Sequence, residues 1–282
     1  MIRRLTIVGL GLLGGSLAKA ARAESLAREI VAVGRRVGSL EPALADGAVD
    51  RITTDIAEGV AGADLVVLAT PVATLEAQLP AVWRAAAEGA LVTDVGSAKA
   101  RIVRAAEALA TKRPLAFVGG HPMAGSNLAG YGVSRADLFR GALVILTPTE
   151  RTSVEALKRA SELWEAVGSR VMSLDPVTHD RAVAAVSHLP HLVADALVAA
   201  VARMDPQFFD VAARGFKDTT RIAAGDPDMW TEIFLANRVA LAASVEAFGL
   251  ALADLQRAIA AGDADALRAV LAGIKAVREG LR

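Results

Sequence analysis

Short apolar runs alternate with helix-like runs through the first half of the chain. The strand-like runs at 5–8, 30–33, 65–69, 91–95, 115–118 and 143–147 contain mostly Val, Ile and Leu without strict alternation. Strands that helices cover on both faces show this pattern. Helical stretches such as 16–23 and 98–109 lie between most of these runs. The alternation predicts an α/β fold with a doubly wound, mostly parallel sheet.

The pattern changes in the second half. A helix near 152–167 and a short strand near 170–173 should close the first domain. After Asp175 the chain becomes alanine-rich and helical, over 178–204, 229–260 and 264–279, with Asp263 as N-cap of the last helix. We therefore expect domains over 1–174 and 175–282. Such helices carry more apolar surface than one thin bundle hides, which predicts a homodimer through the C-terminal helices.

A glycine-rich motif, GLGLLG, begins at Gly9 directly after the first strand-like run and opens a helical one. In this context Gly9 permits a tight turn, Gly11 lets the backbone approach a pyrophosphate, and Gly14 allows close packing of helix and strand. The N–H groups of Leu12 and Leu13 would face the negative charge. The motif predicts a Rossmann-type domain that binds a nicotinamide dinucleotide.

The end of the second strand bears on the choice of cofactor. About 20 residues past the last glycine, an NAD site usually carries an acidic side chain. This chain has Gly34, Arg35 and Arg36 there. A guanidinium group suits a 2′-phosphate by its charge and its planar fork of donors, although it can also stack on adenine. We therefore expect NADP or NAD, with NADP favoured.

Composition excludes several classes of protein. The 282 residues are 54% apolar, and 31 basic residues balance 31 acidic ones, so no electrostatic footprint for nucleic acid exists. The absence of cysteine excludes disulfides, thiolate metal sites and cysteine nucleophiles. The chain has no run of about 18 uninterrupted apolar residues, so we predict no membrane span. We expect a cytoplasmic protein that acts on a small molecule.

A hydride-transfer enzyme needs a group that accepts the substrate's hydroxyl proton, and histidine suits this role. His121 follows the fifth strand-like run, at the sheet edge where α/β proteins bind ligands. Ser97, after the fourth run, could hydrogen-bond the substrate hydroxyl, orient His121 or merely cap the next helix. Lys99 is interpreted as a surface residue at the start of that helix.

Two polar clusters stand out in the helical half. In Ser187-His188-Leu189-Pro190-His191, the two histidines share one helical face, and Pro190 should kink the helix beside them. No third ligand accompanies these histidines, so we predict no metal site.

The second cluster, GFKDTTR, ends at Arg221, which could grip a carboxylate in a bidentate manner. A structural salt bridge between Asp218 and an arginine is an equal alternative.

Taken in order, the segments GLGLLGG, LATP, DVGSAK, GGHPMAGS, LFRGALVILTP, SHLPH, GFKDTTRIA and DPDMW resemble the prephenate and arogenate dehydrogenases of tyrosine biosynthesis. The resemblance runs from Ile7 to about Arg238. It implies oxidative decarboxylation of prephenate to 4-hydroxyphenylpyruvate, or of arogenate to tyrosine, with hydride transfer to NAD(P)⁺. The enzyme's work is then positioning and charge handling, because aromatisation of the ring drives the reaction.

The resemblance also implies roles for individual residues. His121 would accept the hydroxyl proton, with Ser97 holding that hydroxyl, while Arg221 pairs with the ring carboxylate. His191 would contact the substrate from the helical domain. Further contacts to substrate would come from Ser187, His188 and Asp218, and further contacts to cofactor from Thr70, Pro71 and Ser97.

One position departs from many relatives, which carry an acid where this chain has Asn127. An uncharged side chain lacks the attraction for an arogenate ammonium group and the repulsion of a prephenate carboxylate. We therefore favour prephenate. Alternatives are a β-hydroxyacid dehydrogenase, an imine reductase, or a sensor that binds NAD(P) without turnover. The first two would not require HPMAG and SHLPH in this order, and a sensor would not need the proton-handling residues.

Overall fold

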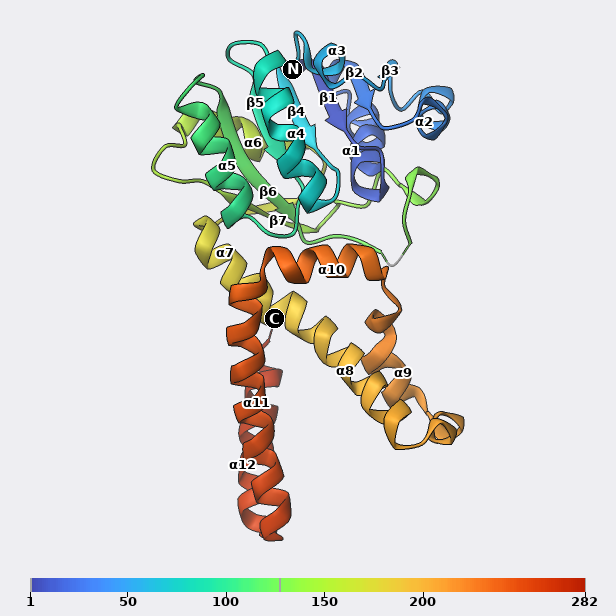
Figure 1. Cartoon of the computed structure of the whole chain (residues 1–282), viewed down its shortest axis with the longest axis vertical. Coiled ribbons are helices and arrows are strands. Elements are labelled where there is room, and N and C mark those ends of the chain that lie inside the picture. The colour runs from blue at the N-terminus through green and yellow to red at the C-terminus, as the bar shows by residue number, and fades with distance from the viewer. Residues whose placement is uncertain (1, 127, 282) are drawn as a thin grey trace. The chain divides into compact units, whose positions relative to one another are not determined.

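The computed structural model describes residues 2–126 and 128–281. Eight strands of this part form one sheet in the order β3-β2-β1-β4-β5-β6-β7-β8 (Figure 1). Six strands run parallel, β7 runs antiparallel to β6, and β8 is parallel to β7, which confirms the mostly parallel sheet. The strands are β1 (Ile2–Val8), β2 (Ala27–Val33), β3 (Arg51–Thr53), β4 (Leu65–Leu68), β5 (Leu91–Asp94), β6 (Ala116–Pro122), β7 (Leu143–Thr147) and β8 (Arg170–Ser173).

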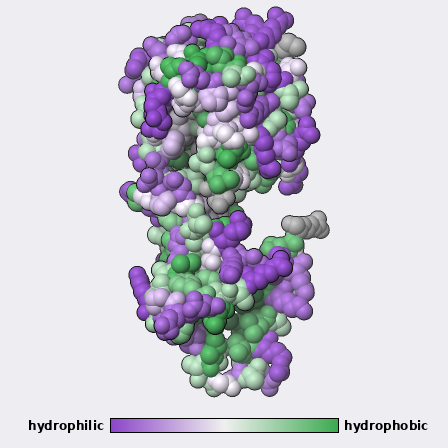
Figure 2. Space-filling view, turned by 90° about the vertical axis from the view of Figure 1, so that its right-hand side faces the viewer, coloured by the Kyte–Doolittle hydropathy of each residue, from purple (hydrophilic) through white to green (hydrophobic). Residues whose placement is uncertain are grey.

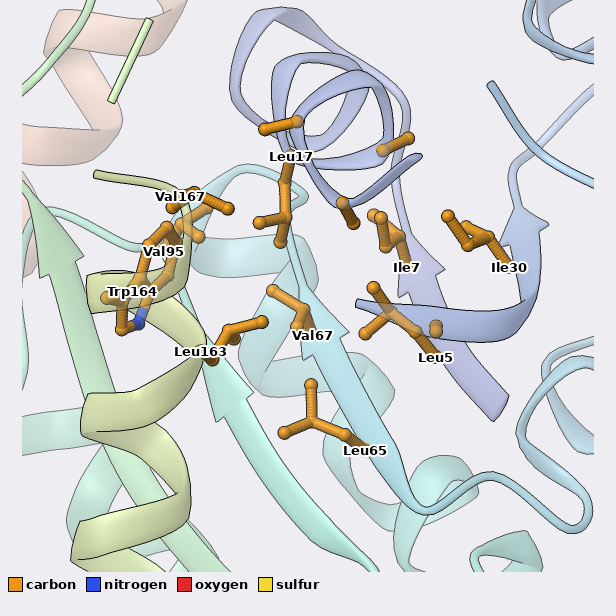
Figure 3. Packing of buried hydrophobic residues seen from close by; sticks show 14 of the residues in the cluster. Leu5, Ile7, Leu17, Ile30, Leu65, Val67, Val95, Leu163, Trp164 and Val167 are labelled. Atoms are coloured by element: carbon orange, nitrogen blue, oxygen red, sulfur yellow. The ribbon is translucent and has the colours of Figure 1, made fainter. Parts of the chain in front are cut away.

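Helices cover both faces of the sheet, which explains the strand runs without polar alternation. On one face, Val67 of β4 belongs to the cluster that contains Leu17 and Trp164 (Figure 3). On the other face, Val66 packs in a cluster with Leu75. The helices of this part are α1 (Leu12–Ala23), α2 (Glu41–Ala45), α3 (Ile56–Val60), α4 (Val72–Ala85), α5 (Ala100–Ala110) and α6 (Val154–Ala166).

The rest of the chain is helical, as its composition predicted. Its helices are α7 (Pro176–Val183), α8 (Leu189–Met204), α9 (Arg214–Thr220), α10 (Pro227–Ala236), α11 (Arg238–Ala261) and α12 (Ala264–Glu279). The prediction of one helix over 229–260 was wrong, because Asn237 leaves the helical conformation and separates α10 from α11. Asp263 caps α12, as expected, by accepting hydrogen bonds from the backbone of Asp265 and Ala266.

The helix that contains Pro190 is interrupted in an unpredicted way. A π-helical turn, Ala184–His188, joins α7 to α8 and ends two residues before the proline. In a regular α-helix the ring of a proline clashes with the carbonyl group four residues earlier, and its missing N–H leaves that group unpaired. A wider turn gives the carbonyl groups room, and π-turns of this kind occur mostly at functional sites.

The chain forms two compact units, one that extends to Asn237 and one from Arg238 to the C-terminus. The first therefore includes α7 to α10 together with the sheet, whereas the predicted domain boundary lies after residue 174. The second unit is the pair α11 and α12. Leu241 is the one buried residue in the α11 segment that the structure describes, and α12 has none.

Apolar side chains cover much of the helical surface, where Figure 2 shows green patches. Two helical stretches, Pro176–Met204 and Arg238–Ala261, are long and apolar enough to cross a membrane. Length and composition are the sole basis for this, and core or interface helices of other proteins meet the same criterion. The predictions of no membrane partner and of a cytoplasmic location therefore stay predictions.

Candidate active site at the carboxyl edge of the sheet

The glycine loop between β1 and α1 has the geometry of a dinucleotide cradle. Gly9 has a φ of +99°, a backbone conformation that residues other than glycine rarely adopt. A Cβ atom on Gly14 would collide with the carbonyl oxygen of Gly9, whereas one on Gly11 would meet no protein atom within 4 Å. No side chain caps the N-terminus of α1. Its free N–H groups, including those of Leu12 and Leu13, therefore suit a pyrophosphate beside Gly11.

The end of β2 lies next to this loop, because the N–H of Gly9 donates to the carbonyl of Val33 at 2.8 Å. Gly34, Arg35 and Arg36 follow that strand, and both arginines are exposed. Neither guanidinium has a hydrogen-bonding partner in the described part of the chain. Both side chains are therefore exposed and unpaired close to the glycine loop.

A buried ion pair lies beneath the carboxyl edge, between β5 and β6. The ammonium of Lys99 contacts the carboxylate of Asp94, and neither side chain has exposed area. The same ammonium donates to the carbonyl of Gly120 at 2.9 Å. Burial lowers the pKa of Lys99, an effect that Asp94 opposes. The interpretation of Lys99 as a surface residue was therefore wrong, because the turn after β5 directs its side chain into the sheet.

The carboxylate of Asp94 also accepts hydrogen bonds from the backbone of two segments, the turn after β5 and strand β6. The donors are the N–H of Gly96 at 2.8 Å and that of Gly120 at 3.2 Å. Gly120 directly precedes His121, so the buried pair fixes the backbone from which the histidine side chain extends.

His121 lies within β6, not after it, one residue before the strand ends. It is 8% exposed. Burial lowers the pKa of His121 well below its usual range, and His179 and Lys99 lower it further. The ring is therefore neutral at physiological pH, as a proton acceptor requires.

The ring of His121 is anchored by a histidine that sequence reasoning left without a role. Its Nδ1 lies 2.9 Å from Nε2 of His179, and Nδ1 of His179 lies 2.8 Å from a carboxylate oxygen of Asp180. Burial raises the pKa of Asp180. Hydrogen bonds from His179 and from two backbone N–H groups outweigh burial, so the pKa is below its ordinary value.

Those two backbone groups belong to the N-terminus of α5. Asp180 accepts from the N–H of Lys99 at 2.7 Å and from that of Ala100 at 2.9 Å. A carboxylate on α7 thus caps a helix that begins 80 residues earlier. Ser97 makes no capping hydrogen bond to this helix, so of the alternatives for Ser97 the pure helix cap was wrong.

The same network extends to the SHLPH segment. The side-chain amide of Asn237 donates to the carbonyl of Asp180 at 2.7 Å and lies 3.2 Å from Nδ1 of His188. His188 has no exposed area, and burial lowers its pKa to about 4. The ring of His191 stacks on Trp230, with centroids 3.5 Å apart. His188 lies edge-on to the same indole at 6.3 Å.

The remaining predicted residues lie outside this connected network. Asp218 pairs with Arg214 in an exposed ion pair at 3.1 Å, so the predicted salt bridge exists but does not involve Arg221. Arg221 is exposed and begins a short 3-10 turn, Arg221–Ala224. A Cβ on Gly225, at the end of that turn, would touch Trp230 and His191.

Other predicted positions have fewer contacts. Thr70 donates to Gln78, and Pro71 is the N-cap residue of α4. Ser187 and Ser97 are partly exposed. Asn127 lies outside the described residues.

Sequence reasoning missed four residues of the network: His179, Asp180, Trp230 and Asn237. Asp180 follows His179 directly and lies on the first turns of a helix that Asp175 caps. That placement alone gave no signal, because the partners of both residues lie on β6 and α5. Trp230 belongs to the DPDMW segment, for which the resemblance implied no role of the indole.

Comparisons with known proteins agree with this geometry. The sequence model of the prephenate dehydrogenase nucleotide-binding domain matches residues 17–173, and that of the prephenate dehydrogenase dimerization domain matches residues 175–273. The glycine loop lies before the first match, so its assignment depends on the geometry described above.

Relatives cover most of the chain. Prephenate dehydrogenase of Bacillus subtilis (strain 168) is 34% identical over 83% of this chain, which spans 64% of the length of that relative. The Aquifex aeolicus prephenate dehydrogenase in complex with hydroxyphenyl propionate and NAD⁺ is 36% identical, with a TM-score of 0.92 over 99% of this chain and 98% of its own. The Synechocystis arogenate dehydrogenase is 31% identical, with a TM-score of 0.86 over 98% and 99%.

Two alternative classes share the fold alone. An imine reductase of Myxococcus stipitatus and a 3-hydroxyisobutyrate dehydrogenase of Salmonella typhimurium are 15% and 17% identical, with TM-scores of 0.54 and 0.63. The family models, by contrast, match both halves of the chain. The chain belongs to the prephenate dehydrogenase family.

Proposed function

We propose that this protein is an NAD(P)-dependent dehydrogenase that oxidatively decarboxylates prephenate or arogenate in tyrosine biosynthesis. One observation carries the proposal: His121, buried and neutral, lies at the carboxyl edge of the sheet whose first strand leads into the glycine loop. Ligands of open α/β sheets bind at this edge. The relatives that act on prephenate or arogenate support the same activity.

In the proposed reaction, each of these residues has a separate role. A bound nicotinamide would supply the acceptor for the hydride. His121 takes the proton of the substrate hydroxyl, and Ser97 holds that hydroxyl. Arg221 pairs with the ring carboxylate, which leaves as carbon dioxide as the ring becomes aromatic. Positioning and charge handling are the catalytic contributions, because aromatisation supplies the driving force.

We further propose that the substrate is prephenate. The sequence supports this at Asn127, which offers no negative charge to an ammonium group and none to repel a carboxylate. The decisive measurement is reduction of NAD and NADP with prephenate and with arogenate, four assays side by side. The His121→Asn variant serves as the inactive control. Absence of turnover in all four assays, with cofactor still bound, would favour the sensor alternative.

For the cofactor, we propose a preference for NADP. Arg35 is exposed beside the glycine loop and free to meet a 2′-phosphate. The Arg35→Ala variant should raise KM for NADP by about tenfold, roughly 1.4 kcal/mol, and KM for NAD far less. Arg28→Ala, at the opposite end of β2 and also exposed, is the matched control. Equal effects on the two cofactors would refute the argument from the 2′-phosphate.

A further inference from the structure

The series of contacts His121–His179–Asp180 has a consequence for the proton on His121. An ionised carboxylate can only accept hydrogen bonds. Since Nδ1 of His179 lies 2.8 Å from Asp180, this nitrogen carries a proton. When the ring of His179 is neutral, its Nε2 is the acceptor for the group 2.9 Å away, which is Nδ1 of His121. That nitrogen then donates, whereas a protonated His179 would reverse the hydrogen bond.

We propose that His179, held by Asp180, is a positioning residue that keeps His121 protonated on Nδ1, so that Nε2 carries the free lone pair. This inference deepens the proposed function, because Nε2 becomes the atom that receives the hydroxyl proton. In the described residues, Nε2 of His121 has no hydrogen-bonding partner, as a nitrogen reserved for a substrate requires. When it takes the proton, the substrate O–H bond breaks and an N–H bond forms at Nε2.

Burial makes the hydrogen bond between His121 and His179 irreplaceable. His179 has no exposed area and His121 is 8% exposed, so water cannot substitute for either partner. Without an acceptor at His179, the Nδ1–H of His121 would be a buried donor with no partner, which costs about 1–3 kcal/mol. The ring would then exchange its proton to Nε2 or rotate. In either case the lone pair no longer faces the substrate.

Two substitutions separate positioning from bulk packing. In His179→Leu the acceptor is lost but the volume is largely kept. In His179→Gln the amide oxygen can occupy the position of Nε2, while the amide nitrogen faces Asp180. We expect kcat to fall by about a hundredfold or more in the leucine variant, as for a histidine in the wrong tautomer. The glutamine variant should recover kcat to within about tenfold of wild type. KM for substrate and cofactor should stay nearly constant.

The direct test is nitrogen-15 NMR of histidine-labelled protein without substrate. The chain has four histidines, so single substitutions assign every ring. Wild type should show His121 protonated on Nδ1, the glutamine variant the same, and the leucine variant a loss of that state. Arg181→Ala, exposed on the same helix, should change nothing.

Protonation of His121 on Nε2 in wild type would overturn the proposal, as would full activity in the leucine variant. The wild-type spectrum decides the question even if a variant fails to fold. It also reads the tautomer whether or not prephenate is the substrate, so a failure of the proposed function would leave this result standing.

Discussion

At the scale of the residue, the surroundings of His121 set its pKa. Burial is the largest cause of its lowered pKa, followed by His179 and Lys99. A base works in its unprotonated form, so activity is lost only when the pH falls through that lowered pKa. We expect kcat/KM to stay constant from pH 8 to about 6.5, the ordinary histidine pKa, and to decline only below it.

The pH profile is measured with saturating cofactor. His121→Asn should bind cofactor normally yet lose most of kcat, and its residual rate should lack the acidic decline. A wild-type decline centred near pH 7 would contradict the buried, neutral state of this ring.

Also at this scale, we expect the buried Lys99–Asp94 ion pair to contribute strongly to the free energy of unfolding, although it lies beside a loop. Lys99→Met leaves a buried carboxylate without its partner, which costs about 3–5 kcal/mol. Urea denaturation of Lys99→Met and of the double variant Lys99→Met/Asp94→Asn measures this. The double variant should recover part of the loss. A single variant as stable as wild type would mean that Asp94 is compensated by its backbone hydrogen bonds alone.

At the scale of elements, two glycines of one loop should respond in opposite ways. Gly14→Ala places a Cβ against the carbonyl oxygen of Gly9 and should lower Tm, because the start of α1 must move. Gly11→Ala meets no protein atom and should keep Tm near wild type. It should nevertheless weaken cofactor binding by at least about tenfold, since its methyl group occupies the space of the pyrophosphate.

Thermal unfolding without cofactor and a cofactor titration of each variant make this comparison. Unchanged cofactor affinity in Gly11→Ala would show that the pyrophosphate does not lie against this residue.

The elements themselves show what a single sequence can predict. Buried strands and the glycine loop were predicted because their signals are local: a run of Val, Ile and Leu, or three glycines at fixed spacing. The short strand β3 was missed because three residues give no periodicity. The cap on α5 was missed for another reason, since Asp180 and Ala100 meet only through the fold. Pairings of this kind, including His121 with His179, leave no trace in spacing.

At the scale of the whole molecule, the exposed apolar surface of α11 and α12 predicts self-association. Leu250 and Ile259 are each 66% exposed. The match of residues 175–273 to a dimerization domain supports burial of such side chains by a second copy. We expect a dimer in sedimentation experiments, and Leu250→Glu should shift it toward monomer. Arg257→Ala on the same helix should not, and a monomeric wild type would contradict the prediction.

The carboxylate of Asp180 has a consequence for protein engineering. One of its oxygens accepts hydrogen bonds from both His179 and the start of α5, and the other accepts from Ala100. Selection for thermal tolerance and selection for turnover therefore act on the same atoms here, so neither property can be optimised at this position independently of the other. Libraries that seek a more robust enzyme should keep Asp180 fixed and vary its exposed neighbour Arg181, where the two demands separate.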